Sequence, residues 1–459
     1  MKTYSFKGIL QNNGWRENTC ISINDKGIIT KIYDSTSNVD SIENINGYAI
    51  PGFQNTHSHA FQYAMAGLAE KHQEAANQDD FWGWREAMYQ LALSINPDQM
   101  ETIATMLYSE MARHGYTNVA EFHYVHHDQQ GNPYTDLSEM GSRLVAAAKT
   151  AGIAITLVPI FYQKGGFGLA PNQRQRRFIS PTVDDYLKLV EASVKACSYY
   201  EQATFGIGVH SMRAVEPTDI IKITKSGPQD IPFHIHVAEQ LKEIEECIKY
   251  VNRRPVDWLL DHLDLNDRFH LVHATHISKD ETIRLAKSKA NVILCPSTEG
   301  NLGDGLFPLK NYQKAGGNWS IGTDSHIGLN PLEELRILDY GQRVTSHKRN
   351  TYFSNKQLDA GMYAIEMATL TGRKAMNNYT TSFFEVGQPL NACIIDATAP
   401  LIATSSIDNL TGTIIYASDN RTQWGTIAQG KLIVKNGTHF DHEIITNQFI
   451  KGIKELKNR

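Results

Sequence analysis

The chain has 459 residues, of which 41% are hydrophobic and 20% charged, and its formal net charge is −5. This composition is typical of a globular protein, and a chain of this length usually forms more than one domain. The negative net charge argues against a nucleic acid or an anionic membrane as partner, and no apolar run is long enough to span a bilayer.

The predicted elements change character twice along the chain. Residues 1–50 read as short strands separated by turns, such as Asn24-Asp25-Lys26-Gly27. Eight short apolar runs then alternate with helical patterns; the predicted strands are 49–53, 118–122, 153–159, 205–209, 232–236, 269–273, 292–296 and 319–324. Further short strands are predicted near the C-terminus, at 393–395, 412–416 and 431–437. The alternation predicts an α/β fold, a (β/α)8 barrel over 51–384, with a small β domain built from 1–50 and 385–459.

Cysteine usage indicates the compartment. The five cysteines are scattered and form no Cys-x-x-Cys pair. This distribution predicts free thiols rather than a disulfide framework, and no apolar secretory segment precedes the first predicted strand. We therefore expect a cytoplasmic protein.

Histidines at predicted strand ends indicate a metal site. His57 and His59 are two residues apart, so in a strand both side chains point to one face and can reach one metal ion. In a barrel, functional residues gather at the C-terminal ends of the strands. There we find the candidates His210, His234 or His236, His273 and Asp324. A histidine alone is more often a hydrogen-bonded core residue, but their joint occurrence predicts a centre for zinc or a similar ion.

The fifth predicted strand offers two histidines as metal ligands. His234 and His236 share one strand face, so spacing does not choose between them, but nearness to the strand end favours His236. Glu239 follows three residues later and suits proton transfer beside a metal-activated water. Its alternative role is that of an acidic residue stabilised by the N-terminus of a helix. The fourth strand region holds no lysine to bridge two metals, which favours a single ion.

Longer motifs resemble a known family. His57-Ser58-His59, His236-x-x-Glu239, His273 and Thr323-Asp324 resemble the amidohydrolase superfamily, in its mononuclear deaminase branch. Over essentially the whole chain, the sequence resembles the formimidoylglutamate deiminase family within it. The segments that carry this resemblance are 57–62, 64–70, 81–86, 121–124, 175–178, 298–305 and 333–336. The sequence departs from the family pattern at Tyr63, Gly300 and Asn391, none of which is a proposed ligand.

The resemblance implies a distorted (β/α)8 barrel of the metal-dependent hydrolase type with a small β-sandwich domain, and a homodimer. It implies hydrolysis of N-formimino-L-glutamate, a dicarboxylate amidine, to N-formyl-L-glutamate and ammonia in histidine degradation. The implied zinc ligands are His57, His59, His236 and Asp324. The implied substrate-binding residues are Gln62, Arg85, Tyr124, His210 and Arg213.

We expect three residues to carry the chemistry. Asp324 would bind zinc and accept a proton from water, His273 would orient the attacking oxygen, and Glu239 would pass protons to the leaving nitrogen. The sequence does not divide the base role among them. Arg213 and Arg85 can each form bidentate pairs with a carboxylate, and the aromatic stretch around Arg85 is either a lid or helix packing. No role is predicted for Arg176 or Arg177.

Two alternatives remain at this point. The same barrel could deaminate a purine or another heterocycle, which needs stacking surfaces and neutral amide partners rather than paired arginines. The protein could also be an inactive metal-binding scaffold, although the intact set of ligands with Glu239 and His273 argues against this.

Overall fold

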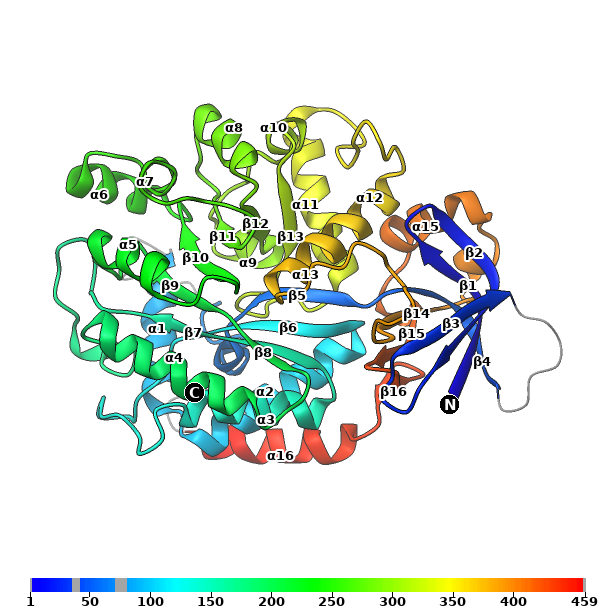
Figure 1. Cartoon of the computed structure of the whole chain (residues 1–459), viewed down its shortest axis with the longest axis horizontal. Coiled ribbons are helices and arrows are strands. Elements are labelled where there is room, and N and C mark those ends of the chain that lie inside the picture. The colour runs from blue at the N-terminus through cyan, green and yellow to red at the C-terminus, as the bar shows by residue number, and fades with distance from the viewer. Residues whose placement is uncertain (1, 35–41, 71–80, 457–459) are drawn as a thin grey trace.

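The computed structural model describes residues 2–34, 42–70 and 81–456, which form one β-sheet surrounded by helices and a second β-sheet beside it (Figure 1). One sheet is a nearly closed barrel of parallel strands, and the other is built from both ends of the chain. The predicted α/β fold class, a distorted (β/α)8 barrel with a terminal β domain, is confirmed. No helix in the described ranges combines the length and apolar character needed to cross a membrane.

The barrel strands run parallel in the order of the chain. They are β5 (Phe53–Ser58), β6 (Tyr116–His123), β7 (Ala154–Phe161), β9 (Ile207–Ser211), β10 (Phe233–Val237), β11 (Phe269–His273), β12 (Asn291–Leu294) and β13 (Asn318–Ile321). The short β8 (Ala203–Phe205) pairs with β7. The barrel closes where backbone N–H groups of Thr323 and Asp324 donate to the carbonyl of His57, at 3.1 and 3.0 Å.

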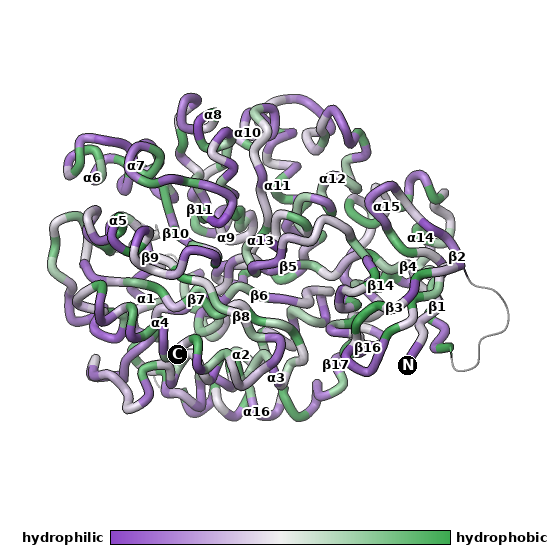
Figure 2. Tube along the Cα trace, in the orientation of Figure 1, coloured by the Kyte–Doolittle hydropathy of each residue, from purple (hydrophilic) through white to green (hydrophobic). Residues whose placement is uncertain are grey.

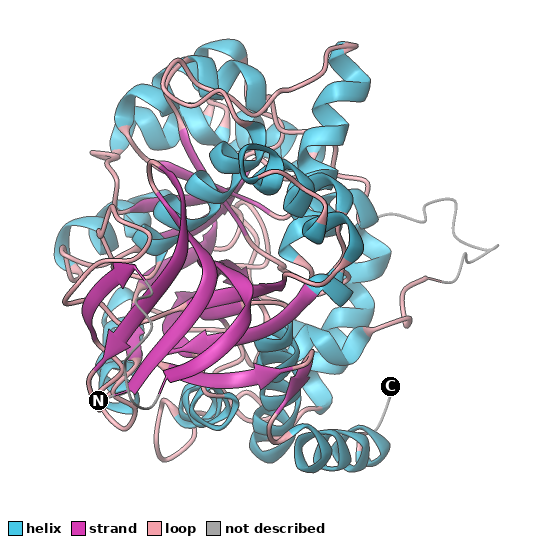
Figure 3. Cartoon of the chain, turned by 90° about the vertical axis from the view of Figure 1, so that its right-hand side faces the viewer, coloured by secondary structure: helices cyan, strands magenta, loops and turns pink. Residues whose placement is uncertain are grey.

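The terminal sheet has eight strands, all antiparallel to their neighbours except for the β1–β4 pair. The N-terminal strands are β1 (Lys2–Gln11), β2 (Gly14–Ile23), β3 (Ile29–Asp34) and β4 (Ile42–Pro51), and the C-terminal ones are β14 (Ala392–Asp396), β15 (Gln423–Ala428), β16 (Lys431–Lys435) and β17 (Thr438–His439). Because β14 pairs with β4, the two ends of the chain share one sheet. Figure 3 shows this sheet as a curved layer in front of the barrel.

Sixteen α-helices connect and cover the strands within the described ranges. They are α1 (Phe81–Ser94), α2 (Pro97–Arg113), α3 (Glu139–Ala151), α4 (Val183–Cys197), α5 (Pro217–Ser226), α6 (Leu241–Val251), α7 (Pro255–His262), α8 (Lys279–Ser288), α9 (Pro296–Asn301), α10 (Leu309–Lys314), α11 (Pro331–Ser346), α12 (Ala360–Glu366), α13 (Gly372–Ala375), α14 (Pro400–Ala403), α15 (Leu410–Ala417) and α16 (His442–Glu455). Short 3-10 turns are η1 (Ala60–Met65), η2 (Gln173–Gln175), η4 (Ile407–Asn409) and η5 (Asn420–Thr422), and a π-turn, η3 (Met367–Thr371), follows α12.

Local signals explain where several helices begin. The side chain of Asn96 accepts a hydrogen bond from Gln99 N, and Pro97 occupies the first turn of α2. A cap of this kind satisfies an N–H group that has no partner inside the helix. Ser278 caps α8 in the same way. Figure 2 shows hydrophobic and hydrophilic segments along the outer helices, as expected for helices with one face on the barrel.

The first barrel strand lies later in the chain than predicted. The sequence placed it at 49–53, but β4 of the terminal sheet extends to Pro51 and β5 begins at Phe53. β5 is rich in polar residues that are buried and hydrogen-bonded: Asn55 donates to Thr323 Oγ1 at 2.7 Å and Thr56 to the carbonyl of Ile321 at 2.7 Å. Because its polar groups are satisfied inside the barrel, this strand has no hydrophobic pattern to reveal it.

The predicted strand at 412–416 is wrong. These residues belong to α15. The β-branched pair Ile414 and Ile415 favours a strand locally, but both side chains are fully buried in the helical conformation. The helix also lies very close to α12, since a Cβ on Gly361 would be 2.6 Å from the Thr411 backbone. Tertiary packing therefore decides the conformation of this segment.

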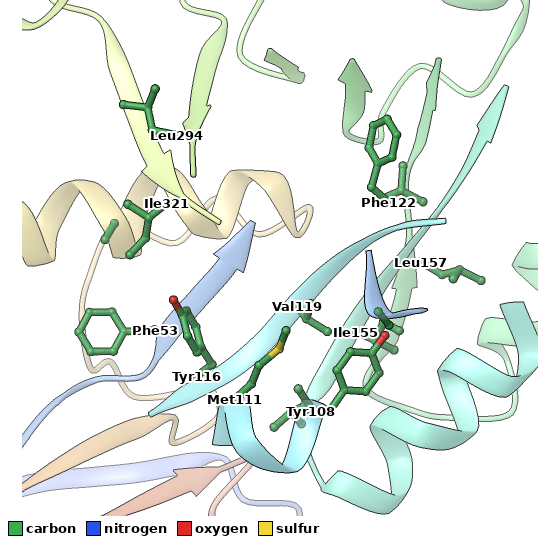
Figure 4. Packing of buried hydrophobic residues seen from close by; sticks show 14 of the residues in the cluster. Phe53, Tyr108, Met111, Tyr116, Val119, Phe122, Ile155, Leu157, Leu294 and Ile321 are labelled. Carbon is green, nitrogen blue, oxygen red and sulfur yellow. The ribbon is translucent and has the colours of Figure 1, made fainter. Parts of the chain in front are cut away.

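The largest hydrophobic cluster joins barrel and terminal sheet. Figure 4 shows Phe53, Tyr108, Met111, Tyr116 and neighbouring side chains packed around the N-terminal ends of β5 and β6. The rings of Phe53 and Tyr116 meet edge to face with centroids 6.2 Å apart. This packing holds the first strands of the barrel in place, and these strands lead directly to the predicted metal ligands.

Candidate metal centre and substrate cavity

Four predicted ligands meet at the C-terminal end of the barrel. The Nε2 atoms of His57 and His59 are 3.1 Å apart, and Nε2 of His236 is 3.0 Å from that of His57. Oδ1 of Asp324 lies 3.2 Å from Nε2 of His59 and 3.6 Å from that of His57. All four residues are buried, and together they form a group that can hold a metal ion.

Hydrogen bonds fix the tautomers of two of these histidines. Nδ1 of His59 donates to the carbonyl of Phe122 at 2.9 Å, and Nδ1 of His236 donates to the carbonyl of His210 at 3.0 Å. A carbonyl only accepts, so the proton is on Nδ1 and the Nε2 lone pairs face one another. Such an arrangement is unfavourable without a cation and is the usual way in which ligating histidines are oriented.

The protonation states also suit a cation. Burial lowers the pKa of His57 to about 3, and it lowers the pKa values of His59 and His236 as well. Although burial alone would raise the pKa of Asp324, the adjoining histidines hold it below its ordinary value. Three neutral imidazoles and one carboxylate form a donor set typical of zinc.

Gly322 allows the chain before Asp324 to lie close to the backbone of His57. A Cβ at this position would lie 2.7 Å from Cβ of His57 and 2.9 Å from its backbone N and O. Asn55 further ties the strands, because its Oδ1 accepts from Thr323 N at 3.0 Å. The register between β5 and β13 therefore fixes Asp324 relative to the histidines.

Glu121 supports the chain on either side of His59, where β5 ends and η1 begins. Its carboxylate accepts from Ser58 Oγ and from Ala60 N, both at 2.6 Å, and from the hydroxyl of Tyr108 at 3.0 Å. Burial raises the pKa of Glu121 to about 7, while these three donors act against that rise. The sequence singled out the segment around Glu121 but predicted no role for it.

The structure places His236, and not His234, beside the other three candidate ligands. His236 faces the cluster, whereas the ring of His234 stacks on His270 with centroids 4.9 Å apart. The two rings lie away from the group of four ligands, so His234 is a buried core histidine.

Acidic residues surround His273 beside the metal ligands. Its Nε2 is 3.7 Å from Glu239 Oε1 and 3.6 Å from Asp324 Oδ2, and its Nδ1 is 3.2 Å from Glu299 Oε1. Burial alone would lower the pKa of His273, but these carboxylates raise it to about 10. His273 is therefore a cation that can donate hydrogen bonds through both ring nitrogens. The sequence analysis predicted no contact between Glu299 and His273, although Glu299 lies in segment 298–305, one of those that carry the family resemblance.

Burial raises the pKa of Glu239 to about 7, against the effect of His273 and Arg213. Asp304 also lies in this acidic group, and burial with Glu239 nearby raises its pKa to about 9. A carboxyl group with a pKa near neutrality can both release and take up a proton, as general acid–base catalysis requires.

A cavity of about 200 Å3 adjoins the metal ligands. All five predicted substrate-binding residues line it: Gln62, Arg85, Tyr124, His210 and Arg213. Gln62 donates to the hydroxyl of Tyr124 at 2.9 Å, and burial lowers the pKa of His210, which keeps it neutral. α1 contributes Trp84, Arg85, Met88 and Tyr89 to the wall, so the helix around Arg85 covers the cavity.

Arg213 links the cavity to the acidic group. Its Nη2 is 4.0 Å from Glu239 Oε2, and its Nε is 3.7 Å from Glu243 Oε2. Glu243 was missed by the sequence analysis, although its position four residues after Glu239 places both near the start of α6. The carboxylates raise the pKa of Arg213, which is buried in the cavity wall, and so favour its charged form.

Comparison with known proteins agrees with this geometry. The model of the amidohydrolase family matches residues 48–433. The chain belongs to the amidohydrolase family. Its sequence is 40% identical over 448 residues to the formimidoylglutamate deiminase of Pseudomonas aeruginosa, covering 96% of this chain and 97% of that protein.

Solved structures show the same fold for this amidohydrolase. A crystal structure of an amidohydrolase from Brucella melitensis superposes with a TM-score of 0.93 at 39% identity, covering 99% of this chain and all of the other. An adenosine deaminase from Xanthomonas campestris, solved with bound zinc, gives a TM-score of 0.80 at 18% identity, covering 100% and 98% of the two chains. The second similarity concerns the fold alone.

Proposed function

We propose that this amidohydrolase uses one zinc ion to hydrolyse N-formimino-L-glutamate to N-formyl-L-glutamate and ammonia, a step of histidine degradation. The observation that carries the proposal is the placement of a three-histidine, one-carboxylate group and two arginines, Arg85 and Arg213, around one cavity. The similarity to the Pseudomonas aeruginosa deiminase over nearly the whole chain supports it.

The described residues fit a metal ion. Two Nε2 lone pairs are fixed by the bonds of the opposite ring nitrogens, and they converge with His57 and Asp324 on one point. We assign His57, His59, His236 and Asp324 as ligands. When bound there, zinc would lower the pKa of a coordinated water to about 7 and so supply a nucleophile at neutral pH.

Asp324 and His273 would prepare the attack. Oδ1 of Asp324 faces the histidine cluster while Oδ2 faces Nε2 of His273 at 3.6 Å, so Oδ2 is placed to accept the proton of the attacking water. His273, held as a cation by its acidic neighbours, would donate through Nε2 and orient the attacking oxygen.

Glu239 would handle the leaving nitrogen. Water adds to the formimino carbon, and the C–N bond to the terminal nitrogen must then break with that nitrogen protonated to leave as ammonia. Glu239 lines the cavity between His273 and Arg213, and its pKa of about 7 suits both uptake and release of a proton.

The two carboxylates of the substrate need cationic partners. Arg213 and Arg85 supply planar donor groups that match a carboxylate, and Tyr124, His210 and Gln62 add directional hydrogen bonds. Guanine, adenine and adenosine carry no carboxylate that could bind to either arginine. The cavity of about 200 Å3 is also below the roughly 300–1,000 Å3 of sites for drug-sized ligands, which favours a small linear substrate over a nucleoside.

A substrate panel tests the proposal. Zinc-loaded protein is incubated with N-formimino-L-glutamate and, separately, with guanine, adenine and adenosine, and ammonia is measured in each. We expect ammonia only from the formimino compound, with N-formyl-L-glutamate identified by NMR. Release from a ring substrate alone would replace this function with a heterocycle deaminase.

We further propose that the enzyme is a cytoplasmic homodimer. The five cysteines are free and buried, which is compatible with a reducing compartment. The dimer is inferred from the family resemblance. Light scattering of the purified protein tests it, and a monomer of 51.5 kDa would contradict it.

A further inference from the structure

The segment Gln175–Phe178 lies between the substrate cavity and the end of α1. Arg177 is fully buried and donates from Nη1 to the carbonyls of Ala92 and Ile95, the latter at 2.7 Å. Its Nε donates to the carbonyl of His127 at 2.8 Å. The last carbonyls of a helix lack partners within the helix and form the negative end of its dipole. Arg177 therefore fixes the C-terminal end of α1 to the loop after β6.

Gln175 holds the same helix from the cavity side. Its Nε2 donates to the hydroxyl of Tyr162 at 2.9 Å and to that of Tyr89, on α1, at 3.2 Å. Both tyrosines line the substrate cavity. The Gln175 side chain is itself oriented, because its Oε1 accepts from Asn172 N at 3.0 Å.

Phe178 completes the contact. Its ring centroid lies 6.0 Å from that of Tyr89, 5.2 Å from that of Tyr124 and 5.6 Å from that of Tyr162. The segment thus combines a bond to the helix end, a side-chain bond to Tyr89 and aromatic packing against the cavity wall. These contacts fall on the C-terminal part of α1, from Tyr89 to the residue that follows the helix, Ile95, and on the cavity wall that faces it.

Arg85 lies on the same helix, about one turn before Tyr89. Arg85, Met88 and Tyr89 are three and four residues apart, so they share one face of the helix, and all three line the cavity. Cζ of Arg85 lies 5.5 Å from the centroid of the Tyr89 ring. A rotation or shift of α1 would therefore move the Arg85 guanidinium relative to the substrate.

We propose that residues 175–178 form a clamp that positions Arg85, and through it sets the preference of the enzyme for substrates carrying the carboxylate that Arg85 binds. The inference rests on the proposed function. Arg177 and Gln175 are positioning residues in this scheme, since they act on α1 and Tyr89 and not on the reacting atoms.

The chain offers a matched control next to the clamp. Arg176 is only half-buried, and it donates to the carbonyls of Gln129 and Gln173, at 2.8 and 2.6 Å. Neither of these acceptors belongs to α1. The side chain of Gln129 does donate to the Ser94 carbonyl at the end of α1, at 2.6 Å, but Arg176 bonds to the backbone of Gln129. Arg176→Met removes the same kind of side chain from the same segment and should leave the position of Arg85 unchanged.

The kinetic test uses Arg177→Met and Gln175→Leu, with Gln175→Leu as the milder variant should Arg177→Met fold poorly. A misplacement of about 1 Å can cost up to 100-fold, so we expect KM for N-formimino-L-glutamate to rise about tenfold or more, with kcat little changed. Each substitution is then repeated in the Arg85→Ala background, where it should change KM less than about twofold. Equal effects in both backgrounds, or an Arg176→Met variant as impaired as Arg177→Met, would overturn the clamp.

Hydrogen exchange separates this inference from the proposed function. Exchange of the backbone amides around 88–95 is compared in zinc-loaded wild type and the three variants, without substrate. Faster exchange in Arg177→Met and Gln175→Leu, but not in Arg176→Met, supports the clamp even if the wild type proves inactive on N-formimino-L-glutamate. Unchanged exchange in all three variants would refute the clamp while leaving the substrate assignment intact.

Discussion

Replacing Gly322 by alanine would force apart the two strands that close the barrel at the metal centre. The new Cβ would lie 2.7 Å from Cβ of His57 and 2.9 Å from its backbone N and O. Carbon atoms in contact prefer about 3.5–4.0 Å. The backbone of His57, which is fully buried, would have to move by about 1 Å.

Two consequences follow from this movement. Overpacking of this kind costs about 1–3 kcal/mol, and weakening of the bonds from Thr323 N and Asp324 N to the His57 carbonyl costs about 1 kcal/mol each. The free energy of unfolding should therefore fall by about 3–5 kcal/mol. Metal–ligand distances stay within about 0.2 Å of their standard values, so a shift of His57 by about 1 Å should weaken zinc binding. We expect zinc affinity to fall about 10–100-fold, the usual effect of removing a residue that orients a metal ligand.

The assay compares zinc affinity, by competition with a chelator, and denaturant unfolding of the metal-free protein. Gly300→Ala is the control, because a Cβ at that position would have no atom within 4 Å other than those of its chain neighbours and of the backbone of its own helix, α9. It should leave zinc affinity unchanged. A Gly322→Ala protein that binds zinc as tightly as the wild type would refute the argument that close approach of β5 and β13 builds the centre.

Three further substitutions test the proposed roles. Glu239→Gln should retain zinc while kcat falls about 10²–10⁴-fold in the ammonia assay; unchanged turnover would remove the proton-transfer role. Asp324→Asn should lose both activity and much of its zinc, measured by elemental analysis, and normal activity would contradict its assignment. Arg213→Ala should raise KM steeply, with some loss of stability because Glu243 loses its buried partner; wild-type kinetics would exclude Arg213 from the substrate site.

The alternation of apolar and helical segments was enough to predict the barrel. The period of two within a strand predicted that His57 and His59 would point to one face, and their Nε2 atoms do lie 3.1 Å apart. The strand-end rule likewise brought Asp324 and His273 to the same place. These predictions depend only on local geometry and chain order.

Contacts between distant segments could not be predicted in the same way. β5 is polar because Asn55 and Thr56 bond to residues more than 260 positions away, so its pattern did not resemble that of a buried strand. The helix α15 depends on packing against α12, although Ile414 and Ile415 favour a strand locally.

The roles of residues that hold the site in place through hydrogen bonds could not be predicted either. Glu121 bonds to Ser58, between His57 and His59, and Glu299 bonds to His273. Nothing in the sequence pattern around either glutamate distinguishes it from other acidic residues. Arg177 had no predicted role, since its acceptors are backbone carbonyls, which every residue provides. Only the folded chain identifies which carbonyls face it.

In the proposed function, one metal centre performs the hydrolysis of N-formimino-L-glutamate. The most direct measurement is ammonia release from this compound by purified protein whose zinc content is determined in the same sample, before chelation, after chelation and after zinc is restored. We expect about one zinc per chain, with N-formyl-L-glutamate and ammonia formed in proportion to zinc content. Full zinc occupancy without ammonia, or full activity in the metal-free protein, would contradict it.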